Sequence, residues 1–273
     1  MPEVVRPDGT KIQYEVLGER PEVLALAPGI VNSEMAAWEG DPVLGALREH
    51  CGVVVMDQRY AGRSTGPNYP FAYSEMTGDQ LAVAEAAGME RFAVVGRRMG
   101  ANYALRLACV APGRVACAVA IEPLGRHPGS PRSAAYGMFA ETCRLTRAEG
   151  LRAVVAAARE QPRFDVNSAG GPYAARFAAD EAFVAQTLDK GRERYVVRVV
   201  RFRDGMFPDA TPFFSVTPQE LGACPVQIAV VPGDSHLAPG AVALDVVETA
   251  ANATLGGDVA SIAALVKESM QGP

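Results

Sequence analysis

Five nearly continuous apolar runs, each followed by glycine, proline or an acidic residue, constrain the fold of this chain most strongly. They are Val23–Ala27, Val53–Met56, Phe92–Val95, Val115–Ile121 and Val226–Val231. Runs that are apolar on both faces are typical of parallel strands, which are buried between layers of helices. Helical patterns, among them Gln80–Ala87 and Asn102–Val110, lie between these runs. We therefore predict an α/β fold: a mostly parallel sheet covered by helices on both faces.

The chain divides into a sheet core and one helical insertion. Val4–Arg6 and Lys11–Leu17 flank Pro7-Asp8-Gly9, a turn sequence that predicts an N-terminal hairpin. From residue 125 to residue 223 helical patterns replace the strand pattern, most clearly at Leu151–Glu160 and Glu181–Lys190. We predict a core made of residues 1–124 and 224–273, with a helical cap made of residues 125–223.

Composition excludes several classes of partner. The net charge is −5, and no cluster of Lys and Arg is dense enough to indicate nucleic acid. No stretch reaches the 18 apolar residues of a membrane span, and the N-terminus has no secretory signal pattern. The five cysteines have no ligand spacing, which favours reduced thiols. We expect a cytoplasmic protein that binds a small molecule but no nucleic acid or membrane. The sequence leaves open whether the protein forms a homodimer.

Residues 91–107, RFAVVGRRMGANYALRL, place a Gly-x-Arg-x-Gly turn between a strand and a helix. A strand, a Gly-x-nucleophile-x-Gly turn and a helix make a nucleophile elbow, which presents its central side chain on a sharp bend. Gly96 and Gly100 are in place, but the central residue is Arg98. A guanidinium stays protonated in a protein and cannot attack a carbonyl. The sequence thus keeps the turn without its nucleophile.

Four segments of the chain follow one another in the order VLALAPGIVNS, MDQRYAGRS, VVGRRMGANYALRLA and CPVQIAVVPGDSHLAP. Through these segments and their order, the chain resembles the α/β-hydrolase family over nearly its whole length. The resemblance implies the fold predicted above, with the cap inserted between the sixth and seventh strands. It also implies a triad of nucleophile, acid and histidine, with an oxyanion hole made by backbone N–H groups. In this chain the matching amides belong to Ile30 and Met99.

Two of the three triad roles have no occupant of the usual kind. Arg98 stands at the nucleophile position. The family histidine follows the eighth strand, where this chain reads NATLGGDVASIAALVKES and has no histidine. The position of the acid, about three residues after Gly233, holds His236, while Asp234 directly follows the glycine. We therefore expect no serine-hydrolase mechanism of the standard kind.

Two interpretations of Arg98 stay open. Its forked donors suit a carboxylate, an enolate or a phosphate, so it could anchor an anionic ligand. Alternatively, Arg98 forms an internal ion pair with Glu122, Asp57 or Asp234, all of which are expected at the carboxyl ends of neighbouring strands. His236 or Asp234 is the candidate proton-transfer group.

Further candidate substrate contacts come from loops at the same edge of the sheet. They are Asn32, Ser33, Tyr60, Arg97 and Glu122. We interpret Asp57 and Arg59 as structural residues. The three histidines lack metal-ligand spacing, so we expect no metal and no cofactor.

These residues favour a non-hydrolytic enzyme, such as a lyase, isomerase, decarboxylase or cyclase, acting on a small, largely apolar anion. Arg98 would be the anion or enolate anchor. The Ala-, Arg-, Gly- and Val-rich composition is associated with GC-rich bacteria and their secondary metabolism. The alternatives are a small-molecule-binding or scaffold pseudohydrolase and an unconventional hydrolase.

Overall fold

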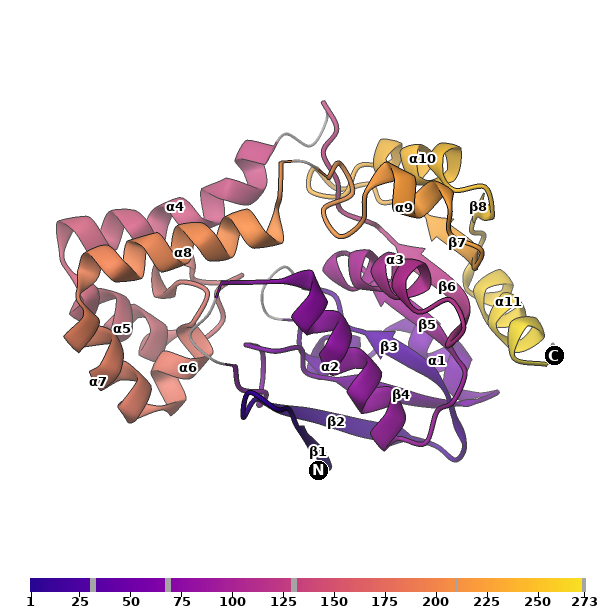
Figure 1. Cartoon of the computed structure of the whole chain (residues 1–273), viewed down its shortest axis with the longest axis horizontal. Coiled ribbons are helices and arrows are strands. Elements are labelled where there is room, and N and C mark those ends of the chain that lie inside the picture. The colour runs from indigo at the N-terminus through magenta and orange to yellow at the C-terminus, as the bar shows by residue number, and fades with distance from the viewer. Residues whose placement is uncertain (30–32, 67–69, 129–131, 210, 272–273) are drawn as a thin grey trace.

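The computed structural model describes residues 1–29, 33–66, 70–128, 132–209 and 211–271, and for residues 132–135 the backbone alone. The strands that it describes form one sheet in the order β1-β2-β4-β3-β5-β6-β7-β8 (Figure 1). Their bounds are β1 Glu3–Val5, β2 Lys11–Leu17, β3 Pro21–Leu26, β4 Gly52–Met56, β5 Phe92–Arg97, β6 Val115–Ile121, β7 Gln227–Val231 and β8 Ala253–Leu255.

The pairing of the strands confirms the predicted sheet. β1 and β2 form the antiparallel hairpin, and β2 also pairs antiparallel with β4. All the later pairs, from β4 with β3 to β7 with β8, are parallel. Every residue of β4 is buried, as expected for a strand that is covered on both faces.

Helices lie on both faces of the sheet. Their bounds are α1 Pro42–Arg48, α2 Tyr73–Ala86, α3 Met99–Val110, α4 Arg132–Ala148, α5 Leu151–Glu160, α6 Ala174–Ala179, α7 Glu181–Lys190, α8 Arg192–Met206, α9 Pro218–Gly222, α10 Gly240–Thr249 and α11 Val259–Gln271, with short 3₁₀ turns η1 Met35–Trp38 and η2 Ser168–Gly170. α1 and α11 pack together on one face, and α2 and α3 pack together on the other. Along β3, Leu24 and Leu26 belong to one buried apolar cluster, whereas Val23 and Ala25 belong to the other. The sheet therefore has a hydrophobic core on each face.

The helices α4 to α8 lie between β6 and β7 in the chain and stand to one side of the sheet (Figure 1). Aromatic rings join them to the core. Phe202 of α8 packs edge-on against Tyr60 and Phe71, with ring centroids 5.3 and 5.5 Å apart. It also packs against Tyr173, at 5.6 Å. Such pairs add to the free energy of burial, so they hold the cap on the core.

One buried side chain of α3 fastens both ends of the insertion. Asn102 donates hydrogen bonds to the carbonyl oxygens of Leu124, at 2.7 Å, and Phe213, at 2.8 Å. Its own oxygen accepts from the Leu124 N–H at 2.9 Å. α9 also contacts α3. The last part of the predicted cap, from Phe213 onward, therefore lies on the core.

The turn between β8 and α11 is short. Only Gly256, Gly257 and Asp258 separate the two elements. Asp258 accepts a hydrogen bond from the Ser261 N–H at 2.9 Å and begins the helix. The structure thus leaves no loop at the place where the resemblance implies a catalytic histidine.

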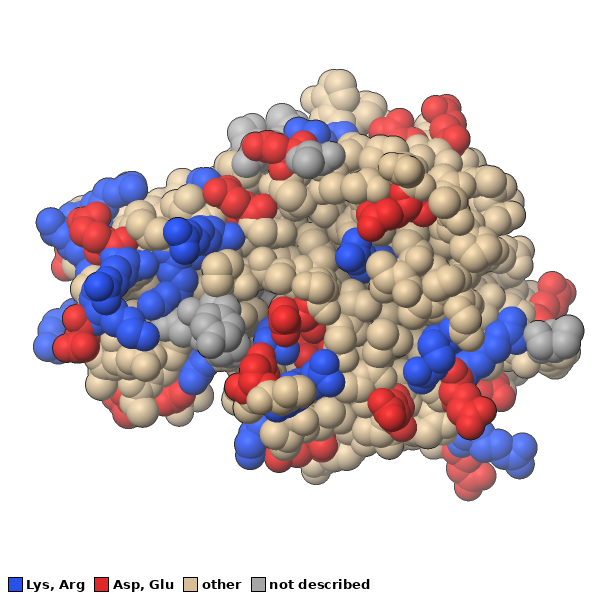
Figure 2. All heavy atoms as spheres, in the orientation of Figure 1, with Lys and Arg blue, Asp and Glu red and all other residues tan. Residues whose placement is uncertain are grey.

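Charge is unevenly distributed on the face shown in Figure 2, where Lys and Arg side chains gather over the cap helices and both signs mix over the core. Composition alone could not show this difference. Among the described helices, none combines the length and the apolar character needed to cross a bilayer.

Candidate functional site

The elbow has the backbone of a sharp strand-to-helix turn. Arg98, between β5 and α3, has φ 54° and ψ −117°, a conformation that residues with a side chain rarely adopt. A Cβ atom on Gly96 would lie 2.0 Å from the Gly100 carbonyl oxygen, and one on Gly100 would lie 2.0 Å from the Leu26 carbonyl oxygen. Both glycines are therefore required by close backbone contacts, and the turn predicted from the sequence is present.

The Arg98 side chain forms one ion pair and leaves donors free. Its Nε donates to Oε2 of Glu122 at 3.1 Å, so Glu122 is its partner among the three predicted carboxylates. The side chain is 49% exposed. Within the described part of the chain, its two terminal nitrogens, Nη1 and Nη2, have no hydrogen-bond partner. Solvent or a ligand can therefore reach these donors.

Glu122 is itself held in a strained position. It directly follows β6 with φ 53°, and its N–H donates to the Val231 carbonyl oxygen at 2.8 Å. Its second carboxylate oxygen, Oε1, accepts from Nη1 of Arg97 at 2.7 Å. Both oxygens of Glu122 are thus bound to neighbouring arginines of the elbow.

Arg97 continues the series of charges toward α1. Its Nη2 lies 2.9 Å from Oδ2 of Asp41. Asp41 is the N-cap of α1, and its Oδ1 accepts from the N–H groups of Val43 and Leu44 at 2.8 and 3.3 Å. We name Asp41, Arg97, Glu122 and Arg98 the elbow charge chain. The sequence predicted Arg97 as a substrate contact; in the structure its side chain is 21% exposed and joins two carboxylates.

Asp41 is the one member of the elbow charge chain that the sequence did not indicate as a site residue. Aspartate before proline is a recognisable helix start, so its capping role could have been predicted. Its contact with Arg97 joins the start of α1 to the end of β5, and no local pattern indicates that approach.

One half of the predicted oxyanion site can be described. Met99 is the first residue of α3, and its N–H has no backbone acceptor among the described residues, as is usual in a first helical turn. Ile30, the predicted second amide, and Asn32, a predicted substrate contact, lie outside the described residues.

Two predicted substrate contacts have other roles in the structure. Ser33 is 1% exposed, and its hydroxyl donates to the Ala27 carbonyl oxygen at 2.6 Å. Tyr60, with φ 74°, packs edge-on against Tyr173 and Phe202 between core and cap. Burial raises the pKa of its phenol to about 12. Both side chains are buried, because the loops that carry them fold inward, and neither is placed to contact a substrate.

The two candidate proton-transfer residues do not meet Arg98. Asp234 and His236 lie in the loop after β7, and both are exposed. Asp234 pairs through its backbone with Pro239. The loop starts beside the site, since a Cβ atom on Gly233 would lie 3.2 Å from Cγ of Glu122. Among the described contacts, neither side chain forms a hydrogen bond or ion pair with the elbow.

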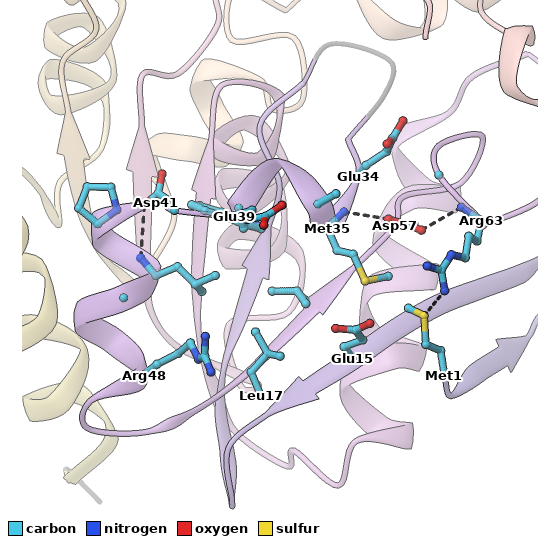
Figure 3. Close-up of a pocket in the computed structure, with 18 residues that line it drawn as sticks. Met1, Glu15, Leu17, Glu34, Met35, Glu39, Asp41, Arg48, Asp57 and Arg63 are labelled. Atoms are coloured by element: carbon cyan, nitrogen blue, oxygen red, sulfur yellow. Dashed lines mark hydrogen bonds between the residues drawn. The ribbon is translucent and has the colours of Figure 1, made fainter. Parts of the chain in front are cut away.

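Asp57 and Arg59 have the structural roles that the sequence suggested. Asp57 accepts from the N–H groups of Met35, at 2.8 Å, and Arg63, at 2.9 Å (Figure 3). Burial raises the pKa of its carboxyl group. Arg59 donates twice to Asp79, at 2.7 and 2.8 Å, in the interior. These bonds fix the loop after β4.

A cavity of about 810 Å³ lies between the sheet edge and α1 (Figure 3). Carboxylates line much of it, including Glu15, Glu34 and Glu39. It meets the elbow charge chain at Asp41 alone. Burial raises the pKa of the Glu34 carboxyl group. In the described residues, no group of three His, Cys, Asp or Glu side chains is placed to hold a metal ion.

Comparison with known proteins gives consistent matches. A family model described as alpha/beta hydrolase fold matches residues 23–165. A protein of Variovorax paradoxus named "Putative carbamate hydrolase RutD" is 30% identical over 224 residues, which cover 81% of this chain and 80% of that protein. A protein of the same name from Caulobacter segnis is 35% identical over 120 residues, 42% of this chain and 44% of its own length.

A solved structure of similar shape is the enol-lactonase of Burkholderia xenovorans. It has a TM-score of 0.63 and 18% identity, and the match covers 99% of this chain and 100% of that one. At this identity the likeness concerns the fold alone.

Proposed function

The chain belongs to the α/β-hydrolase fold family, and we propose that its elbow binds a small monoanionic carbonyl compound, a carboxylate or a carbamate, without attacking it. Arg98 is the anion anchor. The ligand stays non-covalent, because the residue on the elbow has no nucleophilic atom.

The observation that supports this proposal most strongly is which nitrogens of the Arg98 guanidinium have partners and which are free. Nε is bound by Glu122, whereas the two terminal nitrogens have no partner among the described residues, and the side chain as a whole is 49% exposed. A fixed guanidinium with two parallel donors is complementary to the two oxygens of a carboxylate. α3 begins at Met99, directly after Arg98, and the N-terminus of a helix favours negative charge beside it.

The same geometry disfavours the serine mechanism of the family. A triad needs a nucleophile and a histidine within hydrogen-bond reach of each other. Arg98 replaces the nucleophile, and the short turn after β8 carries no histidine.

A second candidate function is turnover of the bound anion. The relatives named "Putative carbamate hydrolase RutD" favour hydrolysis, in which the chain would activate water without a covalent intermediate. The non-hydrolytic reaction predicted from the sequence needs a proton-transfer group. His236 and Asp234 stay candidates for it only if the loop after β7 turns toward Glu122 when ligand binds.

The test is to incubate a metabolite extract of the source organism with wild-type protein or with Arg98→Gln. Bound and free fractions are then compared by liquid chromatography and mass spectrometry. We expect an anion that the wild type retains and Arg98→Gln does not. Recovery of that anion unchanged supports binding. Products whose masses sum to that of the anion plus water support hydrolysis, and an isomer, or loss of CO₂ from a ligand that is not a carbamate, supports the non-hydrolytic reaction.

The matched control is Arg144→Gln, which removes an exposed arginine of the cap that pairs with Glu141. This variant is expected to behave as wild type. Identical fractions for wild type and Arg98→Gln would contradict the proposal and leave the scaffold interpretation.

A further inference from the structure

This inference rests on the proposed function: we propose that Arg97, anchored by Asp41, is a positioning residue that holds Glu122 so that Arg98 binds a planar monoanion end-on. The ligand contacts Nη1 and Nη2 of Arg98. Arg97 itself does not touch the ligand.

Arg97 bridges two elements through different nitrogens. Nη1 donates to Glu122 at the end of β6, at 2.7 Å, and Nη2 lies 2.9 Å from Asp41 at the start of α1. A planar guanidinium keeps these two directions fixed relative to each other. The position of Oε1 of Glu122 is therefore set from the far side of the elbow.

The fixed carboxylate determines which edge of Arg98 is open. Oε2 of Glu122 accepts from Nε of Arg98 at 3.1 Å, which occupies the side edge of that guanidinium. The remaining edge, between the two terminal nitrogens, offers two donors in one plane. A carboxylate or carbamate oxygen pair matches this edge, and the ligand must approach along the axis of the side chain.

Arg97 also prevents a competing arrangement. Without it, Glu122 would be free to turn its carboxylate away from Nε and bind Nη1 and Nη2 of Arg98 with its two oxygens, one of the bidentate pairs that arginine and carboxylate favour. That end-on pair would occupy both donors that the ligand needs.

The charges of the elbow charge chain favour a ligand with one negative charge. Two carboxylates and two guanidinium groups sum to zero. A monoanion at Arg98 leaves a single net charge, whereas a dianion such as a phosphate monoester adds a second one close to Glu122. We therefore expect carboxylates to bind more tightly than phosphate monoesters of the same size.

The first part of the test needs no ligand. In protein labelled with ¹⁵N-arginine, the hydrogen-bonded Nε–H of Arg98 should exchange slowly with water. Arg97→Gln should change the chemical shift of this proton. Asp41→Asn should do so more weakly, because asparagine keeps the cap of α1 but loses the charge. An unchanged Arg98 signal in both variants would overturn the proposed role of Arg97.

The second part measures the affinity for benzoate by calorimetry, with benzamide as the uncharged control and phenyl phosphate as the dianion. Arg98→Gln should weaken benzoate binding about tenfold or more, since hydrogen bonds to charged groups are lost. Arg97→Gln should weaken it several-fold in the wild-type protein and have no further effect in Arg98→Gln. Arg97→Lys should restore part of the loss.

The outcomes separate the two proposals. Equal effects of Arg97→Gln in both backgrounds would show that Arg97 does not act through Arg98, even if Arg98 binds benzoate. Equal affinity for benzoate and benzamide, or no effect of Arg98→Gln, would overturn the proposed function whatever the NMR signals show. Melting temperatures of all variants identify any loss that comes from unfolding.

Discussion

At the scale of single residues, the position of Arg98 distinguishes this chain from a hydrolase with a standard triad. The place of Arg98 on the elbow could be predicted, because the strand, the two glycines and the helix are contiguous in sequence. Its partner could not be singled out, since Glu122, Asp57 and Asp234 all follow parallel strands. The parallel pairing of β5 with β6 brings Glu122 to the elbow: Arg97 is paired with Ile121, and the Arg98 N–H donates to the Ile121 carbonyl oxygen at 2.8 Å.

A serine at position 98 should not create an esterase. In Arg98→Ser the hydroxyl would lack a histidine base, because none follows β8, and loss of triad residues costs roughly 10⁶-fold in kcat. Hydrolysis of p-nitrophenyl acetate should therefore equal that of Arg98→Ala. A burst of nitrophenol with an acetyl adduct on the introduced serine would contradict this expectation.

Glu34 should destabilise the folded protein at neutral pH. Burial raises the pKa of its carboxyl group above the ordinary value of 4.5, so the ionised form is disfavoured in the folded state. Glu34→Gln should therefore raise the free energy of unfolding at pH 7. The gain should shrink as pH falls through the raised pKa and vanish below about 4.5, where the glutamate is protonated in both states.

Urea unfolding at a series of pH values checks this prediction. Glu39→Gln is the control, because Glu39 lines the same cavity but is exposed. A gain that persists at acid pH would show that the cause is not the charge of Glu34.

At the scale of elements, close backbone contacts fix where β5, α3 and β3 meet. The sequence predicted both elbow glycines from their spacing, but only the structure shows what each one contacts. Gly96 lies against Gly100, and Gly100 lies against Leu26 of β3. The elbow is thus held by three neighbouring segments of backbone, which is how a strained residue such as Arg98 persists.

Gly100→Ala should lower the free energy of unfolding by about 3 kcal/mol or more, because the new methyl group meets a carbonyl oxygen that cannot move freely. The matched control is Gly113→Ala, where a Cβ atom has nothing within 4 Å. Urea unfolding of both variants measures the difference. Equal stability of the two would mean that the contact of α3 with β3 is looser than described.

Asn102→Ala should also be strongly destabilising. It leaves the N–H and C=O of Leu124 and the C=O of Phe213 without their partner in a buried place, at about 1–3 kcal/mol for each unsatisfied group. We expect a total loss of roughly 3 kcal/mol and faster proteolysis of the cap. Asn252→Ala, which removes one bond to the Cys224 carbonyl oxygen, should cost about 1 kcal/mol.

At the scale of the molecule, the sequence predicted the order of strands and helices well, because each buried strand is a continuous apolar run. It predicted less of the site. Ser33 and Tyr60 were expected to face substrate, yet their loops fold inward against Ala27 and the cap aromatics. Asp41 was missed, since its ion pair with Arg97 depends on how α1 packs against β4 and α11. Contacts between distant segments are set by tertiary packing, which local patterns do not encode.

If the elbow of this α/β-hydrolase fold is an anion receptor, as we propose, a crystal structure of the protein with benzoate should show the ligand there. We expect the carboxylate in the plane of the Arg98 guanidinium, with its oxygens about 3 Å from Nη1 and Nη2 and with Glu122 still bound to Nε. Benzoate bound elsewhere, with Arg98 closed onto both oxygens of Glu122, would contradict it.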